Sequence, residues 1–219
     1  MKKVLTFIII VVMAVSLVGC MGGKDNSISY KQTAYLIGEC DEFNLTVISG
    51  LRESPYVMDG ERGDLVEFCT ITLKPSSNDG VNVSYTYEVT VEGESYTGSL
   101  NKDTFGTTLS GDIGVDIGDN ITNIVVKFGE ETETIMLENM MANSLISSDD
   151  ALSIAEDALQ DTLSKLPEED KREVYLKFVS DIVGEESVYY WYVAYVGEGG
   201  RYSAVLIDIV SGDIIAKRA

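Results

Sequence analysis

Residues 81–92 read VNVSYTYEVTVE, and this stretch decides the fold class. Every odd-numbered position holds Val or Tyr, and every even-numbered position holds a polar residue. Successive side chains of a strand point to opposite faces, so the pattern predicts a strand with one buried face and one face in water. Gly93 follows as a turn residue, and residues 95–100 are predicted to return as the hairpin partner.

The same alternation recurs on both sides of this hairpin, within residues 30–141. The runs are 43–47, 65–73, 124–128 and 132–137, with turn residues between them. About seven short strands with frequent turns are typical of a β-sandwich, so this segment is predicted to be an immunoglobulin-like sandwich. It lacks the Cys–Trp–Cys pattern of true immunoglobulin domains, and the prediction concerns architecture only.

The pattern changes to a helix near residue 147. Ser147-Ser148-Asp149-Asp150 combines an N-cap with acidic residues that favour a helix N-terminus. Apolar residues then follow at helical spacing up to Leu166, and Pro167 ends the helix. Strands are predicted at 174–179, 187–196, 202–210 and 214–217. Residues 145–219 are therefore expected to form an α+β domain, one helix packed on a small antiparallel sheet.

The strand predicted at 187–196 contains an aromatic run, Tyr189 to Tyr192. One helix can cover only one face of the sheet, and we assign the face of Trp191 and Val193 to it. Tyr190 and Tyr192 then lie on the open face and, with Tyr202, form a candidate interface, because aromatic residues often anchor interfaces. The alternative is that this face packs on the sandwich as an interdomain contact.

The first nineteen residues have the features of a secretion signal. Lys2 and Lys3 precede an apolar run over residues 4–18, which is short for a membrane span but right for a signal-peptide core. The run ends in Leu17-Val18-Gly19-Cys20, which resembles a bacterial lipobox. The resemblance implies removal of residues 1–19, a diacylglyceryl group on Cys20, and a lipid anchor on the extracytoplasmic face of the cell membrane. Residues 20–29 would be a tether. The alternatives to a lipoprotein signal are a plain secretory signal or an uncleaved membrane anchor.

Two further cysteines, Cys40 and Cys69, lie beside predicted strands. Outside the cytoplasm they could form a disulfide within the β-domain. Two buried free thiols are the alternative, and the sequence does not decide between them. Neither has a partner for nucleophilic chemistry, because the chain contains no histidine.

Asp112, Asp116 and Asp119 alternate with glycines and form a weak candidate for a calcium loop, since calcium prefers clustered carboxylates. An EF-hand numbered from Asp112 would need an acidic residue at Gly114 and a glutamate at Asn123. An acidic, glycine-rich turn therefore fits the pattern better, and no metal or other cofactor is predicted apart from the lipid.

Composition excludes several functions. The chain has 219 residues with 16 Lys and Arg against 36 Asp and Glu, a net charge of −20. Loss of residues 1–19 would remove two lysines and no acid, leaving a charge of −22, which argues against binding nucleic acid. The absence of histidine excludes Ser-His-Asp and Cys-His catalysis and HExxH zinc sites. We therefore expect a protein that is not an enzyme; paired carboxylates in a cleft would be the remaining route to catalysis.

The C-terminal segment resembles a known family. The capped helix, the aromatic strand with Trp191, and Asp208 before Ser211-Gly212-Asp213 are similar to a PepSY-type domain, which also occurs in propeptides of thermolysin-like peptidases. Ser211 stands where the family has threonine, and residues 168–177 do not align. Asp208 is expected to shape the turn at Ser211 and Gly212.

The PepSY resemblance implies a non-catalytic module that binds or inhibits an extracellular peptidase or another envelope protein. A ligand-binding or adhesive β-sandwich, with a purely structural C-terminal domain, is the alternative.

Overall fold

A computed structural model describes residues 28–77, 80, 82–103, 106–118, 120–165, 172–183 and 186–219. The predicted signal peptide, Cys20 and most of the tether lie outside these residues. No helix within the described part of the chain is long and apolar enough to cross a membrane.

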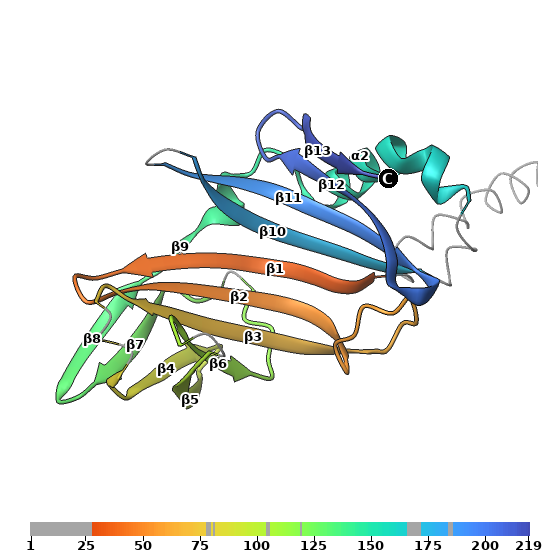
Figure 1. The fold of residues 1–219 in the computed structure, drawn as a ribbon. Coiled ribbons are helices and arrows are strands. Elements are labelled where there is room, and N and C mark those ends of the chain that lie inside the picture. Colours follow the sequence, from red (N-terminus) through yellow and green to blue (C-terminus); the bar gives the residue numbers. More distant parts are fainter. Residues whose placement is uncertain are drawn as a thin grey trace, which may run out of the picture.

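The chain is mainly β, as predicted, and its strands form one large mixed sheet (Figure 1). The strand order is β13-β12-β11-β10-β1-β2-β3-β6-β5-β4-β7-β8, with β9 beside β1. The N-terminal strands are β1 (Ile28–Glu39), β2 (Phe43–Ser54), β3 (Asp64–Pro75), β4 (Tyr85–Val91), β5 (Glu94–Lys102), β6 (Leu109–Ile113), β7 (Asn123–Phe128), β8 (Glu131–Met136) and β9 (Glu138–Asn139). After the 3₁₀ helix η3 (Met140–Asn143), the remaining elements are α2 (Ser148–Leu163), β10 (Glu173–Val183), β11 (Glu186–Gly197), η5 (Glu198–Gly200), β12 (Arg201–Asp208) and β13 (Ile214–Arg218).

The first part of the chain folds into two layers around an apolar core. Strands β1, β2, β3 and β6 contribute one side of this core, and β4, β5, β7 and β8 contribute the other. The alternation of residues 81–92 is preserved from Tyr85 on: Tyr85, Tyr87, Val89 and Val91 of β4 all point into the core, and the polar residues between them do not. Val83 lies before the strand and is exposed, contrary to the prediction. The predicted hairpin is β4 with β5.

The strand order is not that of an immunoglobulin domain, whereas the predicted resemblance concerned the architecture alone and stays a prediction. In an immunoglobulin sandwich the second strand pairs with the fifth, whereas β2 here lies between β1 and β3. Phe43 to Ser54 and Asp64 to Pro75 form one long antiparallel pair. Alternation identifies strands and their buried faces but carries no information about which strands become neighbours.

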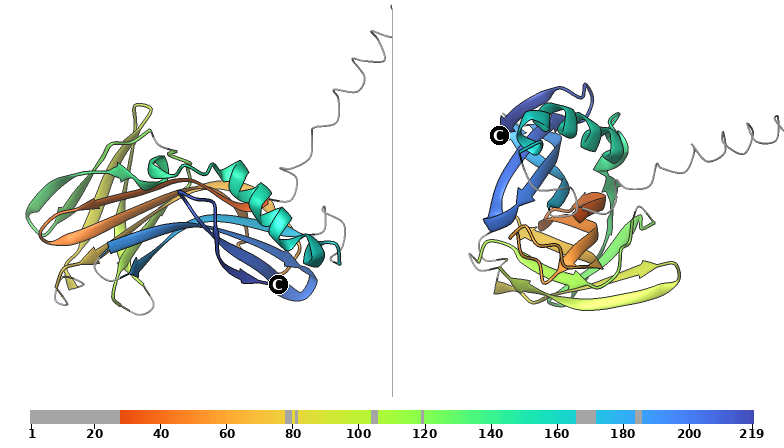
Figure 2. Two further views of the ribbon diagram at one scale, coloured as in Figure 1. Left: turned by 90° about the horizontal axis from the view of Figure 1, so that it is seen from above. Right: turned by 90° about the vertical axis from the view of Figure 1, so that its right-hand side faces the viewer.

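Helix α2 begins at the predicted position. Ser147 is its N-cap, and a capping box joins Ser147 and Asp150. The helix buries Ala151, Leu152, Ala155, Leu159 and Leu163 against one face of strands β10 to β12 (Figure 2).

The turn before β13 is also as predicted. The Asp208 carboxylate accepts hydrogen bonds from the N–H groups of Val210 and Ser211, at 2.9 and 2.7 Å. These bonds hold the pKa of Asp208 below its usual value. The φ of Gly212 is 76°, a left-handed conformation that glycine adopts without strain.

Strand β1 joins the two parts of the chain that the sequence assigned to separate domains. It pairs with β2 on one side and, in parallel, with the start of β10 on the other. The buried side chain of Gln32 extends the junction, because its Oε1 accepts the N–H of Phe178. The sheet therefore crosses the expected boundary without a break, and a division into two domains stays a prediction.

Candidate interaction surface

The sheet of β10 to β13 has one face under the helix and one open face, here defined as the side that carries Lys177, Tyr190 and Tyr192. Trp191 and Val193 point toward the helix, as the alternation predicted. Trp191 is only 2% exposed, and its indole N–H donates to the carbonyl of Ile146 at 2.9 Å. This buried anchor fixes which side chains of β11 face outward.

Cross-strand pairing aligns the open-face residues in a row. Lys177 lies opposite Tyr192, and Tyr192 lies opposite Leu206. On the other side of β10, Tyr175 lies beside Tyr30 of β1. The open face thus continues from the C-terminal strands onto the N-terminal ones.

Lys177 is the centre of this row. Its ammonium lies over three tyrosine rings, 4.7 Å from the centroid of Tyr30, 5.6 Å from Tyr56 and 5.7 Å from Tyr175. It also donates a hydrogen bond to the Tyr56 hydroxyl at 2.9 Å. A cation over aromatic faces is attracted by their quadrupoles, so the three rings hold the ammonium in place.

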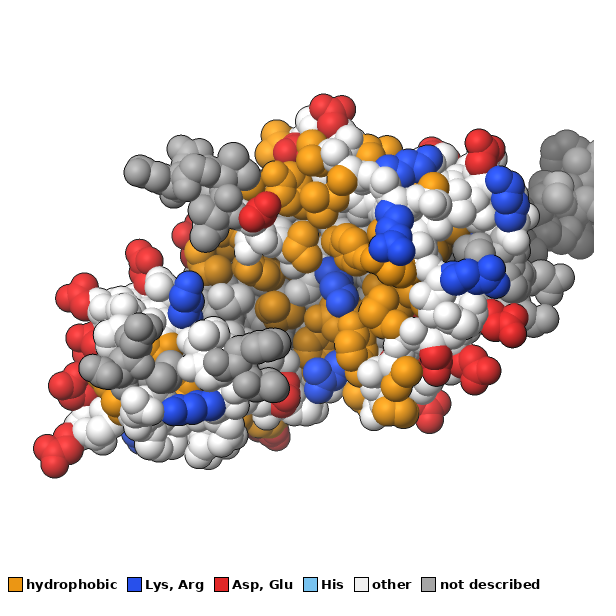
Figure 3. All heavy atoms as spheres, viewed as in Figure 1, with side chains coloured by type: hydrophobic (Ala, Val, Ile, Leu, Met, Phe, Trp, Pro, Cys, Tyr) orange, Lys and Arg blue, Asp and Glu red, His pale blue; other side chains and the backbone are white. Residues whose placement is uncertain are grey.

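Two similar pairs flank Lys177. The Arg52 guanidinium lies 4.8 Å from the ring centroid of Phe68, and that of Arg218 lies 4.0 Å from the ring of Tyr202. Arg218 also donates to the Tyr202 hydroxyl at 2.6 Å. Figure 3 shows the resulting surface, an apolar area in which basic side chains are set and around which most acidic ones lie. A chain of net charge −20 thus has an apolar and locally basic face.

A loop, residues 55–63, covers part of the open face. Tyr56 and Val57 remain 44% and 45% exposed at its surface, while Tyr175 beneath it is fully buried. Gly60 fits tightly here: its φ is 89°, and a Cβ would lie 2.3 Å from the carbonyl oxygen of Gly197. The loop thus covers the part of the face around Tyr175, whereas Tyr190 and Tyr192 remain partly exposed.

Two buried glutamates hold this loop. Glu53 is 1% exposed and Glu173 is 0% exposed. The Glu53 carboxylate accepts the N–H of Gly63 at 3.0 Å, and that of Glu173 accepts the N–H of Gly60 at 2.5 Å. We call Glu53, Glu173 and Tyr175 the carboxyl latch, because the Tyr175 hydroxyl lies 2.6 Å from Glu53 and 2.7 Å from Glu173.

The latch requires an extra proton. One hydroxyl proton cannot serve two carboxylates at once, so the second short oxygen–oxygen contact needs a proton on one of the carboxyl groups. Burial, followed by the contact with Glu53, raises the pKa of Glu173 to about 7. Burial also raises the pKa of Tyr175, so its phenol keeps its proton.

This arrangement makes stability depend on pH. A carboxyl group whose folded-state pKa is raised stabilises the fold fully below its unfolded pKa, and the contribution is lost as pH rises through about 7. We expect the free energy of unfolding to fall between about pH 5 and pH 7.5, by at most about 1.4 kcal/mol per pH unit. Urea unfolding of the wild type and of Glu173→Gln across this pH range measures the change. In the variant, the free energy of unfolding should depend less on pH. Identical profiles would contradict a proton held at Glu173.

Cys40 and Cys69 are free thiols in the structure, which is one of the two alternatives that the sequence left open. The N–H of Cys40 donates to Phe43, which pairs with Pro75, whereas Cys69 pairs with Ser49. Six residues of β3 separate these positions, about 20 Å at about 3.3 Å per residue. A disulfide needs Cα atoms within about 7 Å, so the two thiols are too far apart.

Thiol labelling tests this separation. Cys69 is fully buried and burial raises its pKa to about 12, whereas Cys40 is partly exposed. In the Cys20→Ser chain without reductant, we expect iodoacetamide to modify Cys40 in the native protein and both thiols after denaturation. Mass spectrometry counts the adducts; a denatured chain that takes up label only after reduction would contradict free thiols.

The carboxylates of the candidate calcium loop accept hydrogen bonds from other residues of the chain. One Asp116 oxygen accepts hydrogen bonds from Thr33, Ser49 and the N–H of Gly118, at 2.6, 3.0 and 3.0 Å. Asp112 accepts from Thr70, and Asp119 lies outside the described residues. Within the described ranges no group of three or more Cys, Asp or Glu could hold a metal ion. The contacts of Asp116 instead fit the interpretation as a turn.

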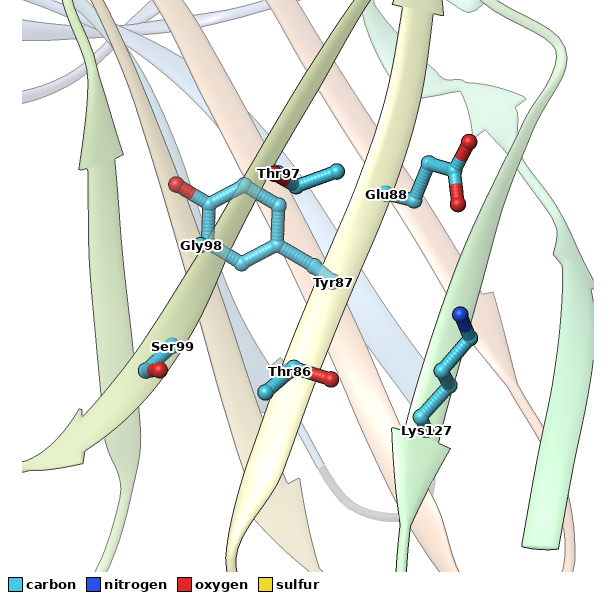
Figure 4. A pocket seen from close by; sticks show the side chains of 7 residues that line it. All are labelled: Thr86, Tyr87, Glu88, Thr97, Gly98, Ser99 and Lys127. Atoms are coloured by element: carbon cyan, nitrogen blue, oxygen red, sulfur yellow. The ribbon is translucent and has the colours of Figure 1, made fainter.

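A shallow pocket of about 270 Å³ lies on strands β4, β5 and β7 (Figure 4). Its side chains include Thr86, Glu88, Thr97 and Lys127, and the Tyr87 ring lies against Gly98. It offers hydrogen bonds and one charge of each sign, and it is the feature that the alternative, a ligand-binding sandwich, would use.

Sequence reasoning found Tyr190, Tyr192 and Tyr202 but missed the residues that organise the face: Tyr30, Arg52, Tyr56, Lys177 and the carboxyl latch. One signal was present. Glu173, Tyr175 and Lys177 alternate with Val174, Leu176 and Phe178, which places three polar side chains on the face opposite the helix. Comparison with known proteins adds nothing further: no family model, no curated protein and no solved structure matches this chain.

Proposed function

We propose that this chain is a non-catalytic, lipid-anchored protein of the cell envelope that binds or inhibits an extracellular peptidase or another envelope protein through its open face. The observation that carries the proposal is the position of Lys177 among three tyrosine rings on that face. Aromatic residues and arginine dominate the energetics of protein interfaces, and this face combines both. In this account residues 145–219 are a PepSY-like unit that supplies Tyr190, Tyr192 and Tyr202.

The anchor is a separate part of the proposal. Cys20 carries the diacylglyceryl group, and residues 20–27 form the tether, because β1 already begins at Ile28. The folded chain lies on the extracytoplasmic side. Two acyl chains are enough for stable attachment, since each buried CH₂ contributes about 0.8 kcal/mol. Intact-mass analysis of the membrane fraction should show the lipid on the wild type, and Cys20→Ala should remove both the lipid and the membrane association. Cleavage without lipid would contradict the anchor and leave the interface proposal standing.

A peptidase-inhibition assay tests the interface. Mature chain carrying Cys20→Ser is titrated against purified extracellular metallopeptidases of the thermolysin type. We expect inhibition that weakens at least about tenfold in the Tyr190→Ala/Tyr192→Ala variant, because interface anchors of this kind contribute more than about 1 kcal/mol each.

A matched variant controls for the alternative function. Glu88→Ala/Lys127→Ala alters the pocket of Figure 4 and leaves the open face intact. Under our proposal it inhibits like wild type. Loss of binding in this variant alone would favour the alternative, a ligand-binding or adhesive sandwich with a structural C-terminal domain.

A further inference from the structure

A cavity of about 1010 Å³ lies where β10 separates from β1. Strand β10 pairs with β1 only as far as Leu176, but with β11 as far as Val183. The opening is closed on its other side by the end of β1 and by β8 and β9. Figure 1 shows β10 and β1 diverging in this region. We call this cavity the β10 groove.

The β10 groove exposes a free strand edge. The N–H of Phe178 points away from β11, since it donates to Gln32 of β1. Backbone groups alternate in direction along a strand, so the N–H and C=O of Ser180 and Ile182 point the same way, into the opening. No strand of the described chain pairs with this edge beyond Leu176. Such an edge is a template for another extended segment.

The lining of the groove has an apolar floor and an acidic rim. Tyr35 and Tyr189 are in edge-to-face contact, with centroids 6.0 Å apart, and the Tyr35 hydroxyl lies 3.0 Å from that of Ser180. Met136 is 68% exposed at the edge of the groove.

The charges on the rim are unbalanced. Glu39, Glu133 and Glu138 line the groove, and Lys74 is the single basic residue of the lining. These three carboxylates make no salt bridge with other described residues.

We propose that the β10 groove binds an extended, basic segment of a partner protein, which adds to the free edge of β10. Backbone hydrogen bonds to Ser180 and Ile182 supply a sequence-independent part of the affinity, as in other cases of strand addition. Alternate side chains of the segment pack on Tyr35 and Tyr189, and the others meet the acidic rim. This site is separate from the open face and does not depend on the proposed inhibition of a peptidase.

The test uses short, fluorescently labelled peptides and the full mature chain with Cys20→Ser. One peptide alternates lysine with valine, and its control alternates glutamate with valine. Fluorescence anisotropy is expected to show at least about tenfold tighter binding of the lysine peptide, because like charges across the rim repel the control. Equal binding of the two peptides would overturn the assignment of a basic partner.

A pair of substitutions at one residue tests strand addition. Ser180→Ala and Ser180→Pro both lose the hydroxyl that contacts Tyr35, but only proline also removes the N–H that faces the groove. We expect Ser180→Pro to weaken binding about tenfold relative to Ser180→Ala. If the two variants bind alike, strand addition at β10 is wrong.

A second variant leaves the backbone unchanged. Glu133→Lys/Glu138→Lys reverses two charges on exposed positions of the rim, so folding is preserved, and it should weaken the lysine peptide about tenfold. Lys177→Glu on the open face should have no effect on it. An unaffected rim variant, or a loss caused by Lys177→Glu, would contradict the site.

Discussion

Replacing Tyr175 by phenylalanine is expected to lower the free energy of unfolding by about 2–4 kcal/mol. The substitution keeps the ring against Tyr30 and Tyr56 but removes the hydroxyl that lies 2.6 Å from Glu53 and 2.7 Å from Glu173. Two fully buried carboxyl groups then lose their shared partner, and an unsatisfied buried charge is among the most costly changes in a protein. Urea unfolding at neutral pH measures the loss.

The local consequence distinguishes this prediction from general destabilisation. Because the carboxyl latch accepts the N–H groups of Gly60 and Gly63, hydrogen exchange should accelerate most in residues 55–63. Tyr190→Phe is the matched control, since this tyrosine is partly exposed on the same face, and it should change stability by less than about 0.5 kcal/mol. Equal stability of Tyr175→Phe and wild type would show that the latch contributes little.

Reversing one charge on the open face is expected to have the largest effect on binding. Lys177→Glu places a carboxylate over three ring faces that attract cations and repel anions. If the face is the interface, affinity for the inhibited peptidase or envelope partner should fall about 100-fold, the size typical of a central anchor residue.

Lys127→Glu provides the matched control for that measurement. Lys127 is an exposed lysine on β7, far from the open face in strand order, and the same charge reversal there should leave affinity within about twofold. Unfolding curves of both variants separate loss of binding from loss of the fold. Equal losses of affinity in Lys177→Glu and Lys127→Glu would mean that Lys177 affects binding only through the net charge of the protein.

Local features of the sequence predicted local structure well. The helix N-cap at Ser147 and the alternation at Trp191 each depend on a few neighbouring residues, and both are found where expected. Asp208 shapes its turn for the same reason, since the groups that it contacts lie two and three residues away.

The features that the sequence did not predict depend on contacts between residues that are far apart along the chain. Tyr175 meets Glu53 across 122 positions, and Phe178 meets Gln32 across 146. The parallel pairing of β1 with β10 brings these segments together. The alternation of apolar and polar residues carries no information about which strands pair. The choice between a disulfide and two free thiols depended on a similar long-range relation: both cysteines flank strands, and the register of β2 with β3 separates them by about 20 Å.

The open face shows both effects. Its tyrosines on β11 follow from one strand and were predicted. Lys177 acquires its significance only when Tyr30 and Tyr56, from β1 and the loop that follows β2, surround it.

Site-specific photo-crosslinking in the intact envelope tests the central claim most directly. A photoreactive phenylalanine analogue is placed at Tyr192 on the open face or at Thr97 in the pocket of Figure 4, in the full chain with its lipidation signal. We predict a discrete crosslinked protein from position 192 that is absent from position 97 and is lost when Lys177→Glu is added. Crosslinks from position 97 alone, or crosslinks at 192 that persist with Lys177→Glu, would contradict an interface centred on Lys177.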